Sequence, residues 1–178
     1  MNNISKKFKE TGSKIVFTQD WHPSDHNSFA SQHPGKSPFD PINNVLGIGP
    51  VLWPDHCVQG TKGSEFHSDL NLTNAHLIIR KGYKKLIDSY SCFLENDKTT
   101  ETGLDGFLKS LNIRRVFMCG LALDYCVYFS AFDGRKKKYD IYVIHDLTRG
   151  IAEESTKSAI NDLQRNNVKF IQSSELMF

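Results

Sequence analysis

Short apolar runs recur along the chain, and most of them are rich in β-branched or aromatic residues. Polar residues or turn-forming residues bound each run, which is typical of buried β-strands. On this pattern we expect strands at 14–18, 76–80, 115–119, 140–144 and 168–172.

Other segments carry the longer periodicity of amphipathic helices. Residues 103–111 place Leu104, Phe107, Leu108 and Leu111 on one stripe, and residues 154–166 do the same with Ala159, Ile160 and Leu163. Strands that alternate with helices predict crossover connections between parallel strands. The fold expected is therefore α/β, a doubly wound parallel sheet with helices on both faces. Functional loops of such a sheet lie beyond the carboxyl ends of its strands.

The 178 residues contain no repeat and no Gly/Ser linker, so residues 1–178 are expected to form a single domain. Lysine and arginine number 22 and aspartate and glutamate 20, which argues against a nucleic-acid or polybasic membrane surface. The chain has no apolar run of the length that a membrane span needs and no signal-peptide pattern, so we expect a cytoplasmic protein. Cys57, Cys92, Cys119 and Cys126 form no CxxC pair and are expected to be reduced.

Residues 25–69 contain most of the prolines and little periodicity, so they predict a long loop. The aromatic residues Phe29, Phe39, Trp53 and Phe66 indicate that this loop is ordered and packed. The segment 3–10 predicts a short helix before the first expected strand. In a βαβ fold such a helix should itself follow a strand, and none precedes it here.

A first candidate site lies at the end of the first expected strand. Asp20 and His22 point the same way in an extended segment, and a turn at Pro23 and Ser24 can return His26 to them. His56 is the candidate for a third imidazole. Three imidazoles and a carboxylate suit Zn²⁺, and equally Fe²⁺ or Mn²⁺. The alternative is an accidental spacing in which the histidines only cap turns.

A second candidate site follows the strand at 115–119. Gly120 permits a turn, Asp124 stands where a helix N-cap is expected, and Cys126 falls in the first turn of a helix over 127–132. Free amides and the positive end of the helix dipole favour a thiolate there, and the same amides could hold an oxyanion. The alternative is that Cys126 is a small buried apolar residue.

A third feature is the pair of cations Arg80 and Lys81 at the end of the strand over 76–80. A solvated strand end explains such a pair by itself. At the carboxyl end of a parallel strand, however, Lys81 would face the same rim as Asp20 and Cys126 and could stabilise the thiolate.

Four motifs, taken in their order and spacing, resemble the nicotinamidase/pyrazinamidase branch of the isochorismatase-like cysteine hydrolases. They are QDWHPSDHNSF, WPDHCVQGT, RKG and GLALDYCV, and the resemblance covers nearly the whole chain. It implies the metal ligands Asp20, His22, His26 and His56, the nucleophile Cys126 and its partner Lys81. It also implies an oxyanion site on the amides of Ala122 and Cys126, with a cis bond at Ala122–Leu123, and an aromatic wall at Trp53 for a pyridine ring.

The resemblance further implies hydrolysis of nicotinamide, and of pyrazinamide, to the acid and ammonia, with one divalent ion, most naturally zinc. The expected partners are a small-molecule amide and, in a homo-oligomer, further copies of the chain. The chain departs from the family at its start, because family members open with a central strand whose aspartate is the general acid and base. Glu10 lies on the wrong side to replace it, so we expect a chain that begins too late and a gap in the sheet.

Two other functions stay open on this reasoning. A related amidohydrolase could act on a carbamoyl or ureido substrate, against which the set of metal ligands argues. A non-catalytic homologue that binds a metal or a ligand would be consistent with the absent aspartate, but it would not need Cys126 and Lys81.

Overall fold

The computed structural model describes residues 1–43 and 45–178, and its strands confirm the predicted α/β class. Five strands occur close to the predicted ranges: β1 (Val16–Asp20), β2 (Leu77–Lys81), β3 (Arg115–Leu121), β4 (Asp140–Arg149) and β5 (Lys169–Ile171). The strand β4 extends beyond its predicted end because, after an irregularity, it pairs again with the last residues of β3.

The helices are α1 (Asn2–Glu10), α2 (Leu104–Ser110), α3 (Tyr128–Lys136) and α4 (Glu153–Arg165). A π-helical turn, Leu123–Val127, leads directly into α3. Short 3₁₀ turns lie at Ala30–Gln32, Lys62–Ser64, Leu72–Asn74 and Ser173–Glu175. Within the described residues, none of these helices is long and apolar enough to cross a membrane.

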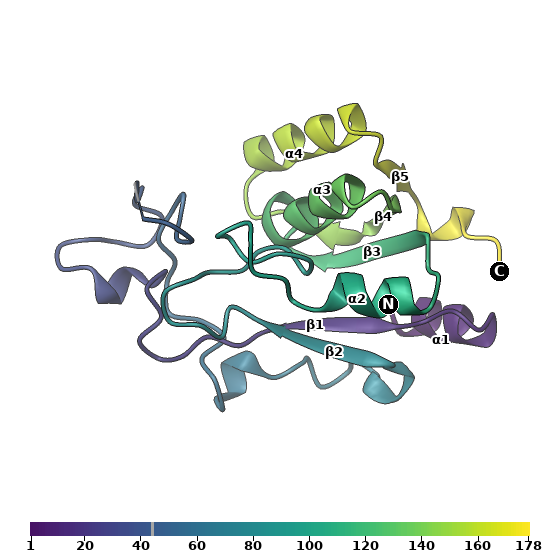
Figure 1. The fold of residues 1–178 in the computed structure, drawn as a ribbon, viewed down its shortest axis with the longest axis horizontal. Coiled ribbons are helices and arrows are strands. Elements are labelled where there is room, and N and C mark those ends of the chain that lie inside the picture. The colour runs from purple at the N-terminus through teal and green to yellow at the C-terminus, as the bar shows by residue number, and fades with distance from the viewer. Residues whose placement is uncertain (44) are drawn as a thin grey trace.

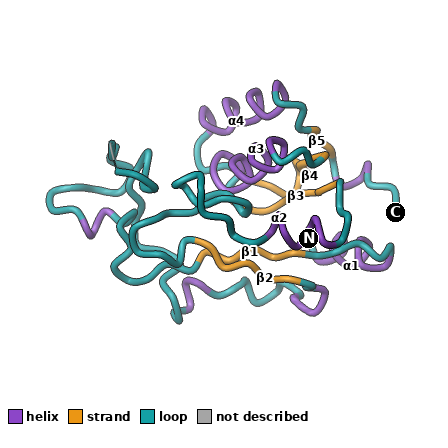
Figure 2. Tube along the Cα trace, viewed as in Figure 1, coloured by secondary structure: helices purple, strands orange, loops and turns teal. Residues whose placement is uncertain are grey.

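Every ladder is parallel, but the strands form two sheets, with the orders β1-β2 and β3-β4-β5. No ladder joins β1 to β3 anywhere in the two described ranges. Each of these strands therefore has one edge that pairs with no other strand of the described residues. Long connections gather beyond the carboxyl ends of β1 and β2 (Figure 1), where Figure 2 shows mostly loop.

Helices cover both faces of the three-stranded sheet. Ile141 and Val143 of β4 point into the core beneath α3, and Gly134 lets that helix approach closely, because a Cβ there would lie 2.8 Å from Cδ1 of Ile141. Phe117 of β3 points to the other face, where the ring of Phe8 from α1 packs against it with centroids 5.0 Å apart.

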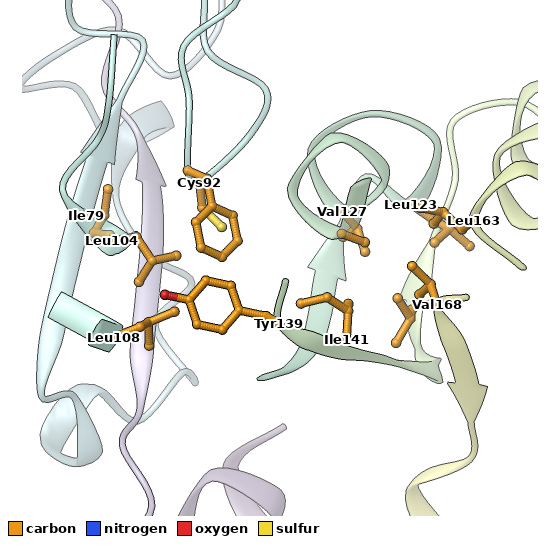
Figure 3. Close-up of a cluster of buried hydrophobic side chains, with 13 residues drawn as sticks. Ile79, Cys92, Leu104, Leu108, Leu123, Val127, Tyr139, Ile141, Leu163 and Val168 are labelled. Carbon is orange, nitrogen blue, oxygen red and sulfur yellow. The ribbon is translucent and has the colours of Figure 1, made fainter. Parts of the chain in front are cut away.

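One hydrophobic core serves both sheets. Figure 3 shows Tyr139 between the leucines of α2 and Ile141 of β4, and Ile79 of β2 belongs to the same cluster. The ring of Phe93 stacks on Tyr139 with centroids 5.6 Å apart. The packing of α2 and the loop before it therefore holds the two sheets together.

The long loop is ordered by backbone bridges, as predicted. Phe29 and Trp53 pair in an isolated parallel bridge, and both side chains are buried. Phe66 is half-buried against Phe17, whereas Phe39 is largely exposed. The burial of Phe29 and Trp53 fixes the loop over the carboxyl ends of β1 and β2.

Candidate active site and metal centre

The register of β1 and β2 places Asp20 beside Lys81. The two residues are paired at the carboxyl ends of adjacent parallel strands, and Oδ1 of Asp20 lies 2.5 Å from Nζ of Lys81. The side chain of Lys81 is buried and that of Asp20 is about one quarter exposed. Burial would raise the pKa of the Asp20 carboxyl, but the Lys81 ammonium outweighs that effect and holds the pKa below its ordinary value.

Lys81 also contacts the candidate nucleophile. Its ammonium donates to Asp20, to the carbonyl of Ser89 at 2.7 Å and to Sγ of Cys126 at 3.4 Å. Burial disfavours the charged form, but these partners raise the pKa of Lys81 above its ordinary value, so the amine stays protonated. Lys81 therefore contacts both Asp20 and Cys126 and connects the two residues.

The environment of Cys126 differs from the one expected at a helix start. Burial raises the pKa of the Cys126 thiol above its ordinary value, and Lys81 opposes that rise. Cys126 also lies in the π-helical turn Leu123–Val127 rather than in the first turn of an α-helix. Its thiolate thus depends on the nearby ammonium rather than on a helix dipole alone.

Asp124 does not cap the helix that contains Cys126. Its carboxylate instead accepts the amides of Ile151 and Ala152 and the hydroxyl of Ser155, at the start of α4. The free amides of a helix N-terminus attract a carboxylate from wherever the fold supplies one. Asp124 thereby ties the turn that contains Cys126 to α4.

The expected cis bond lies one residue earlier than predicted, at Leu121–Ala122. Leu123 begins the π-helical turn, so the change of direction occurs at the end of β3 instead of inside that turn. The carbonyl of Ala122 accepts the amides of Tyr125 and Val127 at 3.2 and 3.0 Å, which closes the turn.

Backbone hydrogen bonds bring two of the expected metal ligands together. The amide of His22 donates to the carbonyl of Cys57, and the amide of Gln59 donates to the carbonyl of His22. His56 therefore lies beside His22, with ring centroids 4.9 Å apart. Ligand atoms of Asp20, His22 and His56 all lie within 4.8 Å of one another.

The hydrogen-bond partners of these two rings decide which nitrogen is free. Nδ1 of His22 faces the carbonyl of Gly82 at 2.8 Å, and Nδ1 of His56 faces the carbonyl of Pro54 at 2.8 Å. A carbonyl can only accept, so both Nδ1 atoms carry the proton and both Nε2 atoms keep a lone pair. Burial lowers the pKa of His22 to about 4, which keeps that ring neutral. Two neutral imidazoles and a carboxylate are a donor set that fits a divalent metal ion.

His26 does not belong to this group of ligand atoms, and its role as a fourth ligand stays a prediction. Nε2 of His26 donates to the carbonyl of Ile87 at 3.3 Å, and Nδ1 accepts from the hydroxyl of Ser28 at 2.7 Å. Both nitrogens are thus occupied by the protein. His26 instead forms a second, fully buried group with His22 and Asp88.

Aromatic rings lie next to both parts of the site. Trp53 is buried, and its Nε1 donates to the hydroxyl of Tyr90 at 2.9 Å. The ring of Tyr125, adjacent to Cys126 in the chain, meets Trp53 edge-on with centroids 4.8 Å apart. Sequence reasoning missed Tyr90 and Tyr125, for which the only signal was an aromatic residue in each loop that follows a strand.

Comparisons with known proteins identify the family of the chain. Residues 1–175 match the isochorismatase domain family. A nicotinamidase of Acinetobacter baylyi is 48% identical over 165 residues, which are 92% of this chain and 76% of that protein.

Two solved structures extend the similarity to the fold. A nicotinamidase/pyrazinamidase of Acinetobacter baumanii superposes with a TM-score of 0.89 at 45% identity, over 98% of this chain and 86% of its own. A pyrazinamidase of Pyrococcus horikoshii in complex with zinc has a TM-score of 0.76 at 33% identity, over 96% of this chain and 82% of its own. The chain belongs to the isochorismatase domain family, and within that family its similarity is to the nicotinamidases.

Proposed function

We propose that the chain hydrolyses nicotinamide to nicotinate and ammonia, with Cys126 as the nucleophile. The observation that carries the proposal is the position of Lys81, whose ammonium contacts both Asp20 and Sγ of Cys126. A buried cation at this distance stabilises a thiolate against burial. The similarity to enzymes named nicotinamidases supports the choice of substrate.

In this scheme the Cys126 thiolate attacks the carboxamide carbon, and a C–S bond forms. The oxygen of the tetrahedral intermediate rests on the amides of Ala122 and Cys126, with Leu123 completing the turn. The C–N bond then breaks as a water molecule donates a proton to the nitrogen, and ammonia leaves. Water attacks the resulting thioester, which releases the carboxylate and restores the thiolate.

The aromatic rings supply a place for the pyridine ring. Trp53, Tyr90 and Tyr125 meet edge-on, and Trp53 and Tyr125 lie near the metal-ligand group and the nucleophile respectively. Such rings bind a flat heteroaromatic ring by stacking and edge contacts. Pyrazinamide has the same ring size and carboxamide, so we expect it to be a second substrate.

Asp20, His22 and His56 would hold one divalent ion, which we propose is zinc. When bound, this ion supplies a Lewis-acidic contact for the ring nitrogen, directly or through water. The chain's own residues do the orienting, since Gly82 and Pro54 fix the two imidazoles through their carbonyl groups.

Asp25 and Asp124, which are close in the chain to His26 and Cys126, are already engaged by other partners. Asp124 is fully engaged at the start of α4, and Asp25 pairs with Lys85 at 2.7 Å on the surface. Among the described residues, Asp20 is the carboxylate that contacts Lys81.

The test is ammonia release from nicotinamide by the wild-type chain and by Cys126→Ala. The matched control is Cys119→Ala, because Cys119 lies in β3, the strand that precedes Cys126, and is an exposed thiol. We expect the first variant to lose ammonia release while it keeps its metal, and the second to retain both. Equal activity in Cys126→Ala would exclude the assigned nucleophile. Activity on a ureido substrate alone would identify a related amidohydrolase instead.

A further inference from the structure

Asp88 is a buried carboxylate for which the proposed reaction has no use. It lies in the loop between β2 and α2 and is 2% exposed. One carboxylate oxygen accepts the amide of Ser89 at 2.8 Å, and the other has no hydrogen-bond partner among the described residues. Burying such an oxygen without a partner is costly, so its position needs a reason.

The surroundings of Asp88 point toward the metal centre. A carboxylate oxygen of Asp88 and one nitrogen each of His22 and His26 lie within 4.8 Å of one another, and all three residues are buried. The ring of His26 packs against that of His22 with centroids 4.5 Å apart. His22 belongs to both groups, so the carboxylate of Asp88 lies next to a proposed metal ligand.

The balance of positive and negative charges at the site favours a further carboxylate near the metal ligands. A divalent ion and the Lys81 ammonium bring three positive charges into a largely buried region, and Asp20 and a Cys126 thiolate offset two of them. Asp88 supplies the third negative charge. Buried charge is tolerated when it is locally compensated, so a carboxylate at this depth favours the ion-bound state.

Asp88 is placed to act on the ion through His22 rather than to bind an ion itself. Both nitrogens of His26 are already occupied by Ser28 and Ile87, and Nδ1 of His22 is occupied by Gly82. A second ion at the inner group would have to displace these partners.

Building on the proposed metal site, we propose that Asp88 is a positioning residue that strengthens ion binding at Asp20, His22 and His56. Asp88 makes no hydrogen bond to His22, so it acts through its negative charge. Removal of a group that supports a metal ligand typically changes metal affinity about 10- to 100-fold, and we expect an effect on this scale.

The experiment measures zinc affinity and stoichiometry of the full chain, after metal removal, in competition with a chromophoric chelator. Asp88→Asn keeps the shape but removes the charge, and it should weaken zinc binding about 10- to 100-fold with one ion per chain in both proteins. Asp88→Glu restores the charge and should recover part of the affinity. The metal-free unfolding temperature of Asp88→Asn should match or exceed that of the wild type, because an unpaired buried charge has been removed.

The control is Asp25→Asn, which changes a surface carboxylate that pairs with Lys85 and lies next to His26 in the chain. Its zinc affinity should equal that of the wild type. Unchanged affinity in Asp88→Asn would overturn the inference and leave the metal site intact. A second ion that only the wild type binds would make Asp88 a ligand and would also overturn it. A wild type that binds no zinc would overturn the proposed metal site and the inference with it.

Discussion

The backbone of Gly82 lies against the ring of His22, with the carbonyl of Gly82 accepting the Nδ1 proton at 2.8 Å. Gly82 has φ +65, and a Cβ at this position would lie 2.7 Å from Nδ1 of His22. The site therefore needs glycine here for two reasons, the backbone conformation and the absence of a side chain. The residue after Lys81 thus controls the orientation of a proposed metal ligand in the loop that follows β1.

Gly82→Ala should displace His22 and weaken zinc binding by at least about 10-fold, the scale expected when the partner of a metal ligand is disturbed. Zinc titration of the metal-free protein measures this directly. Gly35→Ala is a suitable control, because it has a similar φ of +76 but a Cβ there would meet nothing within 4 Å. Equal zinc affinities in the two variants would show that the close contact between Gly82 and His22 does not affect zinc binding.

Lys81→Ala should slow alkylation of Cys126 by iodoacetamide, since Lys81 is the cation that opposes the effect of burial on the pKa of this thiol. The reacting species is the thiolate, so a higher pKa lowers the rate at a fixed pH. Peptide mapping after limited labelling separates Cys126 from Cys119, whose labelling should not change. A rate at Cys126 that is independent of Lys81 would remove the lysine from its assigned role.

Asp105 should contribute stability that disappears in acid. It is buried and accepts from Tyr139, Lys109 and Lys137 at 2.8 to 3.2 Å. Burial alone would raise the pKa of Asp105, but these partners hold it below its ordinary value. The contribution is therefore complete above the unfolded-state pKa of about 4 and is lost as the pH falls through the lower folded-state pKa.

Asp105→Asn should accordingly reduce the free energy of unfolding by about 1–3 kcal/mol at pH 7, with a smaller difference from the wild type at about pH 3. Urea denaturation at several pH values gives both numbers. Asp140→Asn, at an exposed carboxylate 3.6 Å from Arg135, serves as the control and should change little. A pH-independent loss at Asp105 would indicate lost packing rather than a lost charge.

The unpaired edges of β1 and β3 should accept an added parallel strand. An N-terminal extension that supplies such a strand, with an aspartate at its carboxyl end, should raise the unfolding temperature and increase ammonia release from nicotinamide. The aspartate would provide acid and base catalysis, which typically contributes about 10²- to 10⁴-fold. The same extension with asparagine separates the two effects, because it should stabilise the fold without the gain in activity. No change in either quantity would show that the two edges do not bind a strand.

The local sequence was sufficient to predict the five strands and the proximity of three candidate site residues. The apolar runs predicted all five strands because a buried parallel strand needs a continuous apolar segment. Parallel strands bring their carboxyl ends to one edge of a sheet, so the sequence pattern alone predicts that Asp20, Lys81 and Cys126 lie close together. The structure places these three residues together.

The tertiary structure alone decided how individual polar groups are used. His26 has the spacing of a ligand, yet both its nitrogens have partners in Ser28 and Ile87. Asp124 has the position of a helix N-cap, yet its carboxylate binds the residues that lead into α4. Asp88 gave no signal in the sequence, because nothing along the chain shows that its loop places it next to His22. Hydrogen-bond partners distant in sequence become neighbours only when the loops pack, and their competition for each nitrogen and oxygen cannot be deduced from spacing.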